Sequence, residues 1–143
     1  MIGQKGLNLI RQWEGFKPYP YKCPADKMTI GYGHVIKENE NFIQITPAEA
    51  EELLLDDVID AEKAVIRVNE KIPLSANQYD ALVSLVFNIG IGAFENSSMY
   101  GYLMSKDYVA AASEFPRWCK ANKRGLKGLL KRRIDEMLLF MEE

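Results

Sequence analysis

The sequence has little cysteine and little histidine, and each shortage excludes a class of protein. Only two of the 143 residues are cysteines, Cys23 and Cys119, so no disulfide framework stabilises the fold and a hydrophobic core must do so. We expect both thiols to be free. His34 is the only histidine, and no cluster of Asp, Glu or Cys has the spacing of metal ligands. The sequence therefore predicts neither a metal site nor a cofactor.

The sequence also lacks long apolar runs. No window approaches the ~20 apolar residues of a membrane-spanning helix, and the N-terminal segment lacks the apolar stretch of a secretory signal. We therefore expect synthesis and folding in the cytoplasm, with no insertion into membranes. Apolar residues make up 48% of the chain and charged residues 27%, which is typical of one globular domain and not of a disordered or fibrous protein.

Charge is distributed unevenly along the chain, although the net charge is only -2. Residues 38–62 contain nine acids and no base, whereas residues 117–133 contain eight bases and no acid. A positive surface over 117–133 would suit an anionic polymer, either nucleic acid or the bacterial cell wall. The same segment is equally well interpreted as the solvated face of a helix, so charge alone leaves the function open.

Hydrophobic periodicity predicts helices around a small β-region. A first helix is expected to end near Gly15. Prolines and a glycine-containing run of β-formers over residues 16–45 then favour a hairpin or a three-stranded meander. Its turns are expected near residues 24–27 and 38–41.

Two capping boxes mark the starts of two longer helices. Thr46 and Glu49 begin a helix that we expect to reach about Val68, with an apolar stripe opposite its acidic face. Ser75 and Gln78 begin a helix that is apolar nearly all round, which indicates the buried central helix. A turn is predicted at residues 88–92, and further helices over residues 97–104, 108–115, 116–121 and 128–141.

The residues able to carry chemistry after the first helix have a distinctive spacing. Glu14 is followed after eight residues by Cys23 and after five more by Thr29, which precedes Ile-Gly-Tyr-Gly-His34. This run resembles the catalytic signature of the phage-type lysozymes of glycoside hydrolase family 24, in which the middle residue is Asp or Cys. The resemblance continues in order through the segments G-L-N-L-I-R, T-P-A-E-A-E-E-L-L, P-L-S-A-N-Q-Y-D-A-L-V-S-L-V-F-N-I-G-I-G-A-F, R-W and R-R-I-D-E.

The resemblance implies a mainly α, α+β fold of the lysozyme-like, bilobed kind. Residues 1–143 would form a single domain, with a small β-containing lobe at about 15–60 and a helical lobe at about 61–143 that includes the N-terminal helix. A long helix would join the lobes. The implied activity is that of a muramidase, which hydrolyses the β-1,4 bond between N-acetylmuramic acid and N-acetylglucosamine in bacterial peptidoglycan and lyses the host cell.

The resemblance also assigns chemical roles. Glu14 would be the general acid, because glycoside hydrolysis needs a protonated carboxylic acid beside the leaving oxygen. Burial in an apolar cleft wall near Trp13 and Phe16 would help it to keep its proton near neutral pH. Cys23 and Thr29 would position the attacking water for a single displacement with inversion, and Thr29 is favoured because a free thiol is mostly neutral. A small, structural Cys23 stays open as an alternative.

Two neighbouring residues are expected to have other roles. Asp26 lies three residues from both Cys23 and Thr29; we interpret it as a turn residue, with a second carboxylate as the reserve interpretation. His34 is expected to be structural, hydrogen-bonded beneath the hairpin.

By resemblance, substrate would contact Val35, Phe87, Asn88 and Ser97, although Phe87 is equally well a core residue. We expect a monomer that acts on peptidoglycan, binds no nucleic acid, and reaches the wall after release by a holin-type membrane protein. Two alternatives stay open: a lytic transglycosylase, which needs only the glutamate, and a catalytically silent peptidoglycan-binding module.

Overall fold

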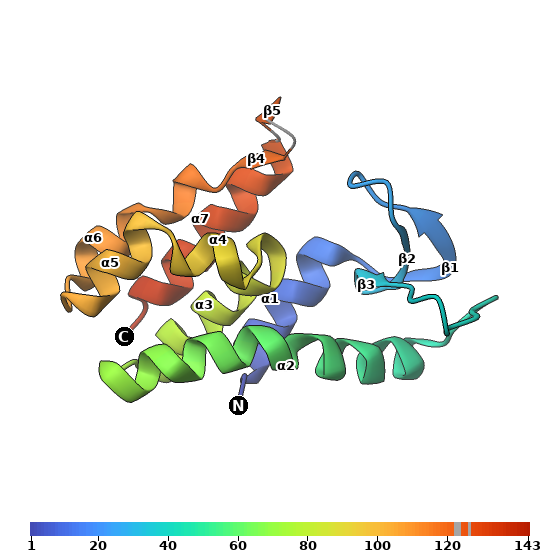
Figure 1. Cartoon of the computed structure of the whole chain (residues 1–143), viewed down its shortest axis with the longest axis horizontal. Coiled ribbons are helices and arrows are strands. Elements are labelled where there is room, and N and C mark those ends of the chain that lie inside the picture. Colours follow the sequence, from blue (N-terminus) through green and yellow to red (C-terminus); the bar gives the residue numbers. More distant parts are fainter. Residues whose placement is uncertain (122–123, 126) are drawn as a thin grey trace. The chain divides into compact units, whose positions relative to one another are not determined.

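The computed structural model describes residues 1–121, 124–125 and 127–143 (Figure 1). The helices are α1 (Gln4–Glu14), α2 (Pro47–Lys71), α3 (Ala76–Ile89), α4 (Ile91–Glu95), α5 (Ser98–Met104), α6 (Tyr108–Ser113), the 3₁₀ helix η1 (Phe115–Arg117) and α7 (Lys127–Met141). The strands are β1 (Lys17–Lys22), β2 (Met28–Gly31), β3 (His34–Val35), β4 (Lys120–Ala121) and β5 (Arg124–Gly125). The mainly α, α+β class predicted from the sequence is confirmed.

The chain divides into two compact units. One contains Met1–Leu9 and Asp60–Glu143, and the other contains Ile10–Ile59. We call them the helical unit and the sheet unit. Helices α1 and α2 each begin in one unit and end in the other. That the chain forms a single domain with two lobes stays a prediction.

The sheet unit contains a three-stranded antiparallel sheet in the order β1-β2-β3. This is the meander that the sequence predicts, with the expected turn between β1 and β2 at residues 24–26. The connection between β2 and β3 is a tight turn at Tyr32 and Gly33, and the turn predicted near residues 38–41 is present after β3, at residues 38 and 39. Ile30 of β2 is fully buried and packs with Ile45 and Ala50, so the sheet and the start of α2 share one small core.

Helix α2 begins at the predicted capping box. The Glu49 amide donates to Thr46 Oγ1 at 3.2 Å, and the Thr46 amide donates to Glu49 Oε1 at 3.0 Å. The helix extends three residues beyond the predicted end at Val68. Buried Ile72 follows Val68 at helical spacing and continues the apolar stripe, which explains the extra turn.

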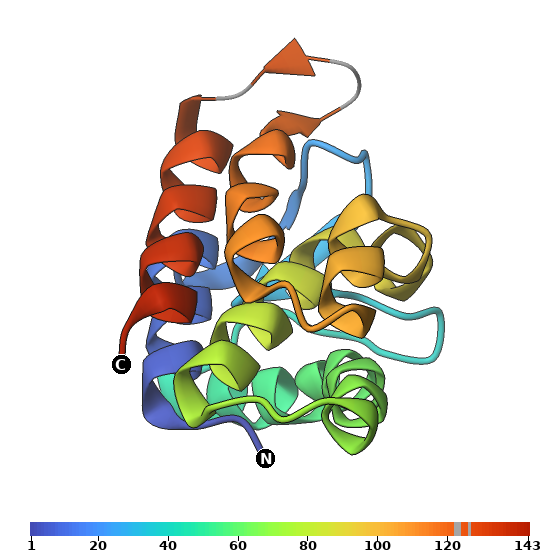
Figure 2. The same ribbon diagram turned by 90° about the vertical axis from the view of Figure 1, so that its left-hand side faces the viewer.

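Helix α3 is the buried centre of the helical unit, as predicted. Its start has both bonds of the Ser75–Gln78 capping box, and every residue from Tyr79 to Val86 is buried. Helix α7 packs along α3 and also against η1 (Figure 2).

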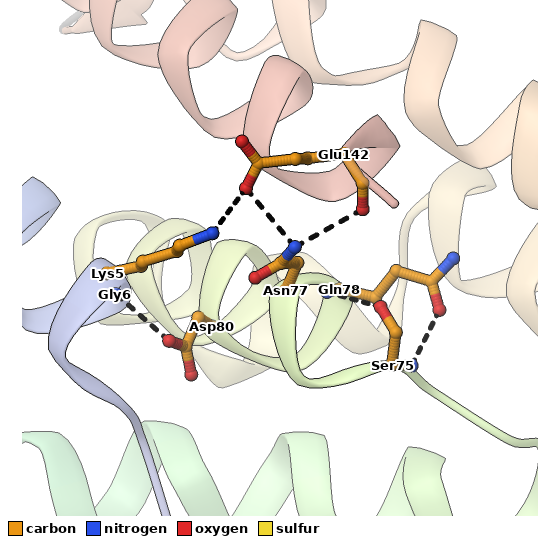
Figure 3. Close-up of polar contacts among 7 residues, drawn as sticks. All are labelled: Lys5, Gly6, Ser75, Asn77, Gln78, Asp80 and Glu142. Atoms are coloured by element: carbon orange, nitrogen blue, oxygen red, sulfur yellow. Dashed lines mark hydrogen bonds and ion pairs between the residues drawn. The ribbon is translucent and has the colours of Figure 1, made fainter.

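The N-terminal end of α1 is fixed to α3 by the buried Asp80 (Figure 3). Its carboxylate accepts hydrogen bonds from the amides of Gly3, at 2.9 Å, and Gly6, at 3.0 Å. These amides have no partner inside the helix, so Asp80 acts as a cap supplied by another helix. Lys5 adds an ion pair of 2.7 Å with Glu142, which brings the two ends of the chain together.

One prediction for the C-terminal half is wrong, and another is incomplete. The helix expected over residues 116–121 is a single 3₁₀ turn followed by β4, because Trp118 leaves the helical region with ψ 49°. The turn expected at residues 88–92 contains the start of α4, because Gly90, at φ 94°, ends α3 and a new helix begins directly after it. The helices predicted near 97–104, 108–115 and 128–141 are present as α5, α6 and α7.

Candidate functional site

Glu14 is the last residue of α1, and the next residue turns the chain into the sheet. The Gly15 amide donates to the carbonyl of Arg11 at 2.9 Å, which closes the last turn of the helix. Gly15 has φ +73°, a left-handed conformation that glycine adopts without the strain of a Cβ atom. The Glu14 side chain is half-buried and leaves the helix at the edge of the sheet unit.

The Glu14 carboxylate lies against Gly33 in the turn between β2 and β3. A Cβ atom built on Gly33 would lie 2.5 Å from Oε1 of Glu14 and 3.0 Å from its carboxyl carbon. Gly33 also has φ +78°, which disfavours any other residue. The turn therefore needs glycine both for its own conformation and for the approach of the carboxylate.

The resemblance noted in the sequence makes Glu14 the general acid of a wall-degrading enzyme, and on that expectation Gly33→Ala should lower the lytic rate by about 100-fold, because a displacement of a catalytic group by about 1 Å has an effect of that size. The rate of clearing of a peptidoglycan suspension measures it. Gly101→Ala is the matched control, since nothing lies within 4 Å of the added Cβ, and it should keep the wild-type rate. A fully active Gly33→Ala protein would show that the close approach of Glu14 to Gly33 is not needed for activity.

Cys23 and Thr29 lie together near the turn of the β1–β2 hairpin. The Cys23 amide and the Thr29 hydroxyl both donate to the carbonyl of Lys27, each at 2.9 Å. Thr29 is buried and Cys23 is half-buried. Burial acts to raise the pKa of the Cys23 thiol, but hydrogen bonds from the Lys27 amide, the Thr29 hydroxyl and the Ala25 amide outweigh it, so the pKa is lowered.

Tyr21 joins these residues and was missed in the sequence. Burial raises the pKa of Tyr21, and the charges of Glu14 and Cys23 raise it further. Tyr21 is also paired with Thr29 across β1 and β2. Its position two residues before Cys23 in a strand is the signal that could have identified it.

Asp26 occupies the hairpin turn, as expected. It has φ 63°, a conformation that Asp tolerates in turns, and its exposed carboxylate lies 3.4 Å from Lys22. The geometry gives no sign that Asp26 acts as a second carboxylate beside Thr29.

His34 of β3 is held between two carboxylates of the sheet unit. Its Nδ1 lies 2.8 Å from Asp57 Oδ2 on α2, and its Nε2 lies 2.9 Å from Glu40 Oε1. Burial acts to lower the pKa of His34, but the hydrogen bonds with Glu40 and Asp57 outweigh it and leave the pKa raised. His34 thus ties the sheet to α2 and to the loop that follows β3.

The free energy of unfolding is expected to fall as the pH rises above about 6.5, the usual pKa of histidine. A raised folded-state pKa means that the native protein binds more protons than the unfolded chain, so this stabilisation is complete below the unfolded pKa and is lost as the pH rises through the folded one. Urea unfolding at a series of pH values measures it. His34→Gln should be less stable and should lack this decline; an unchanged decline would contradict the assignment to His34.

The residues expected to contact substrate lie in both units. Val35 is exposed on β3 of the sheet unit. In the helical unit, Phe87 is half-buried and Asn88 is exposed at the end of α3, where Asn88 Oδ1 accepts from Arg133. Ser97 caps α5 by accepting from the Tyr100 amide at 3.2 Å. Their contact with substrate stays a prediction.

The predicted basic surface over residues 117–133 needs a correction. Arg132 and Arg133 are buried and contribute no surface charge, while exposed Arg117 forms an ion pair of 2.9 Å with Glu114. Residues 122, 123 and 126 of this segment lie outside the described residues.

Among the residues that the structure describes, no group of three or more His, Cys, Asp and Glu side chains could hold a metal ion. A search of the same residues finds no helix with the length and apolar character needed to cross a bilayer.

A mainly α fold with a small antiparallel sheet, and a glutamate that ends the first helix in the same unit as a Cys–Thr pair, defines a lysozyme-like protein. Known proteins agree: residues 11–136 match the sequence profile of the family described as phage lysozyme. The chain is 43% identical to the endolysin of Acyrthosiphon pisum secondary endosymbiont phage 1, with 97% of each chain covered. The chain belongs to the phage lysozyme family, which confirms the resemblance noted in the sequence.

Solved structures give the same result. A P22 lysozyme mutant superposes with a TM-score of 0.86 at 37% identity, covering 99% of each chain. The muramidase domain of SpmX from Asticaccaulis excentricus superposes with a TM-score of 0.89 at 32% identity, covering 100% of this chain and 99% of that one. Endolysins of Bacillus phages PZA and B103 are longer, and the chain spans 54% of each. The family membership makes this chain a peptidoglycan-degrading lysis enzyme.

Proposed function

We propose that the protein is a muramidase that hydrolyses the β-1,4 bond between N-acetylmuramic acid and N-acetylglucosamine. The observation that carries this proposal is the position of the Glu14 carboxylate against Gly33, in the same unit as the Cys23–Thr29 pair. A protonated carboxylic acid and a group that positions water are the two parts that glycoside hydrolysis requires. The name of one structural relative, a muramidase domain, agrees with this specificity.

The proposed reaction is a single displacement. Glu14 donates its proton to the leaving glycosidic oxygen as the bond from that oxygen to the anomeric carbon breaks. A water molecule attacks the anomeric carbon from the opposite face and releases a proton to solvent, from which Glu14 regains its own, so the configuration is inverted. Thr29 orients that water. Cys23 helps to orient the water, and its lowered pKa makes the thiolate form more accessible than in an ordinary cysteine.

The remaining assignments complete the proposal. Val35, Phe87, Asn88 and Ser97 are proposed to contact the glycan. The protein acts as a monomer without a cofactor, and a holin-type membrane protein releases it from the host cytoplasm to the wall.

Product analysis tests the reaction type. Digested peptidoglycan should carry new reducing ends at N-acetylmuramic acid, because water is the acceptor. New 1,6-anhydro ends would instead show a lytic transglycosylase, in which the sugar's own hydroxyl group replaces water. Protein that pellets with peptidoglycan but releases no soluble fragments would show a binding module without activity.

A series of variants tests the roles of Cys23 and Thr29. Cys23→Asp should keep or raise the rate of wall clearing, Cys23→Ser should lower it, and Thr29→Ala should lower it most. Cys119→Ser is the control for thiol replacement in general, because Cys119 lies in the helical unit. Full activity of Thr29→Ala would remove Thr29 from the mechanism.

A further inference from the structure

One face of the three-stranded sheet carries a row of side chains beside Glu14. Tyr21 of β1 is paired with Thr29 of β2, and Thr29 is paired with Val35 of β3. Directly opposite residues of antiparallel strands project to the same face, so these three form one row. Cys23 lies two residues after Tyr21, and its amide continues the strand pairing to Lys27, which places it on that face as well.

The opposite face of the sheet has a structural task. Ile30 and His34, the neighbours of Thr29 and Val35, are paired with each other across β2 and β3. Ile30 packs in the core with Ile45, and His34 bonds to Asp57. The core of this unit therefore occupies one face, and the row beginning with Tyr21 occupies the other.

The proton of the Thr29 hydroxyl is already engaged by the protein. It is donated to the Lys27 carbonyl at 2.9 Å or, in the alternative orientation of the hydroxyl, to the sulfur of Cys23. A hydroxyl group has one proton and two lone pairs, so Thr29 can accept a hydrogen bond from a water molecule but has no proton left to donate to it. A water fixed in one orientation at this place needs a donor from a second group.

Tyr21 has the properties of that donor. It lies directly opposite Thr29 in the sheet, and the charges of Glu14 and Cys23 both act on its hydroxyl. Burial is the largest cause that raises the pKa of Tyr21 above its ordinary value of 10.0, and these two charges raise it further. The phenol therefore keeps its proton at neutral and mildly alkaline pH. It can donate a hydrogen bond to water, but it does not transfer the proton.

We propose that Tyr21 is a further catalytic residue, whose hydroxyl donates a hydrogen bond to the attacking water while Thr29 accepts one from it. The proposal rests on the hydrolysis proposed above. The pair would fix the water by one donor and one acceptor in adjacent strands, and would leave its free lone pair for the anomeric carbon.

Tyr21→Phe tests the proposal, because it removes one hydroxyl and keeps the ring. We expect the kcat for release of reducing ends from a soluble peptidoglycan oligosaccharide to fall by about tenfold or more, the effect of one hydrogen bond made to a reacting group. KM and the unfolding temperature should stay close to the wild-type values. Tyr19→Phe is the matched control in the same strand; Tyr19 is 58% exposed, and all three quantities should be unchanged.

The pH profile separates a donor from a base. In Tyr21→Phe the plateau of kcat/KM should drop while the alkaline limb stays in place, because the phenol does not ionise in that range. Loss of the alkaline limb in Tyr21→Phe would overturn the donor role. A wild-type kcat for this variant, or an effect seen only in KM or in stability, would overturn it as well. Wild-type products with 1,6-anhydro ends would overturn hydrolysis and this proposal together, whereas reducing ends with a fully active Tyr21→Phe would overturn this proposal alone.

Discussion

Glu14→Gln is expected to abolish the clearing of peptidoglycan suspensions. The amide has nearly the shape of the carboxylic acid, so it can occupy the same place against Gly33, but it cannot transfer a proton to the leaving oxygen. General acid catalysis contributes about 100-fold to 10,000-fold to a rate, and the loss should lie in or above this range. A turbidity assay at equal protein concentration measures it.

The control must show that the variant still folds and still reaches its substrate. Glu14→Gln should unfold at the wild-type temperature and pellet with peptidoglycan as the wild type does. Glu52→Gln, an exposed glutamate on α2 of the same unit, should keep full activity. Residual activity of Glu14→Gln above about one tenth of the wild-type rate would be too high for the loss of a general acid.

Local side-chain signals predict the helix starts correctly. The boxes at Thr46 and Ser75 form as expected because each involves residues only three positions apart. Prediction fails where the backbone itself decides: Gly90 ends α3 with a positive φ and allows α4 to follow at once, and Trp118 ends a helix that Pro116 could have begun. Neither angle can be inferred from residue type alone.

The candidate site could be predicted in part. Cys23 and Thr29 lie on one hairpin and both donate to the Lys27 carbonyl, so their spacing was sufficient. Tyr21 escaped notice because the register of β1 shifts between Lys17 and Tyr21, which interrupts the simple alternation of a strand. The partnership of His34 with Asp57, 23 residues along the chain, depends on packing of the sheet against α2, and no local spacing shows it.

Long-range packing also explains the error in the predicted basic surface. Arg132 and Arg133 belong to a run of bases, yet both are buried in the helical unit together with the fully buried Glu136. Glu136 Oε1 lies 3.1 Å from Arg133 Nη1, and its Oε2 lies 3.3 Å from Arg132 Nε. The hydroxyl of Ser84, on α3, donates to Glu136 at 2.5 Å. The cluster therefore connects α7 to the central helix.

Glu136→Ala is expected to lower the free energy of unfolding by about 3–5 kcal/mol, because removal of one partner leaves buried charge without compensation. Two arginines would lose their carboxylate in a place that water does not reach, and the Ser84 hydroxyl would lose its acceptor. Such a loss is a large part of the about 5–15 kcal/mol that stabilises a typical domain. Urea unfolding at neutral pH measures this loss, with the secondary structure of the protein as the signal.

Lys131→Ala provides the control, since Lys131 is an exposed charge on the same helix and its removal should change stability by no more than about 0.5 kcal/mol. Because an ion cluster acts as a unit, Arg132→Met combined with Glu136→Leu should be more stable than Glu136→Ala: the double change removes one charge of each sign and refills the space with apolar atoms. A Glu136→Ala protein as stable as the wild type would show that the arginines of α7 are solvated in solution, and the positive surface inferred from the sequence would then stand.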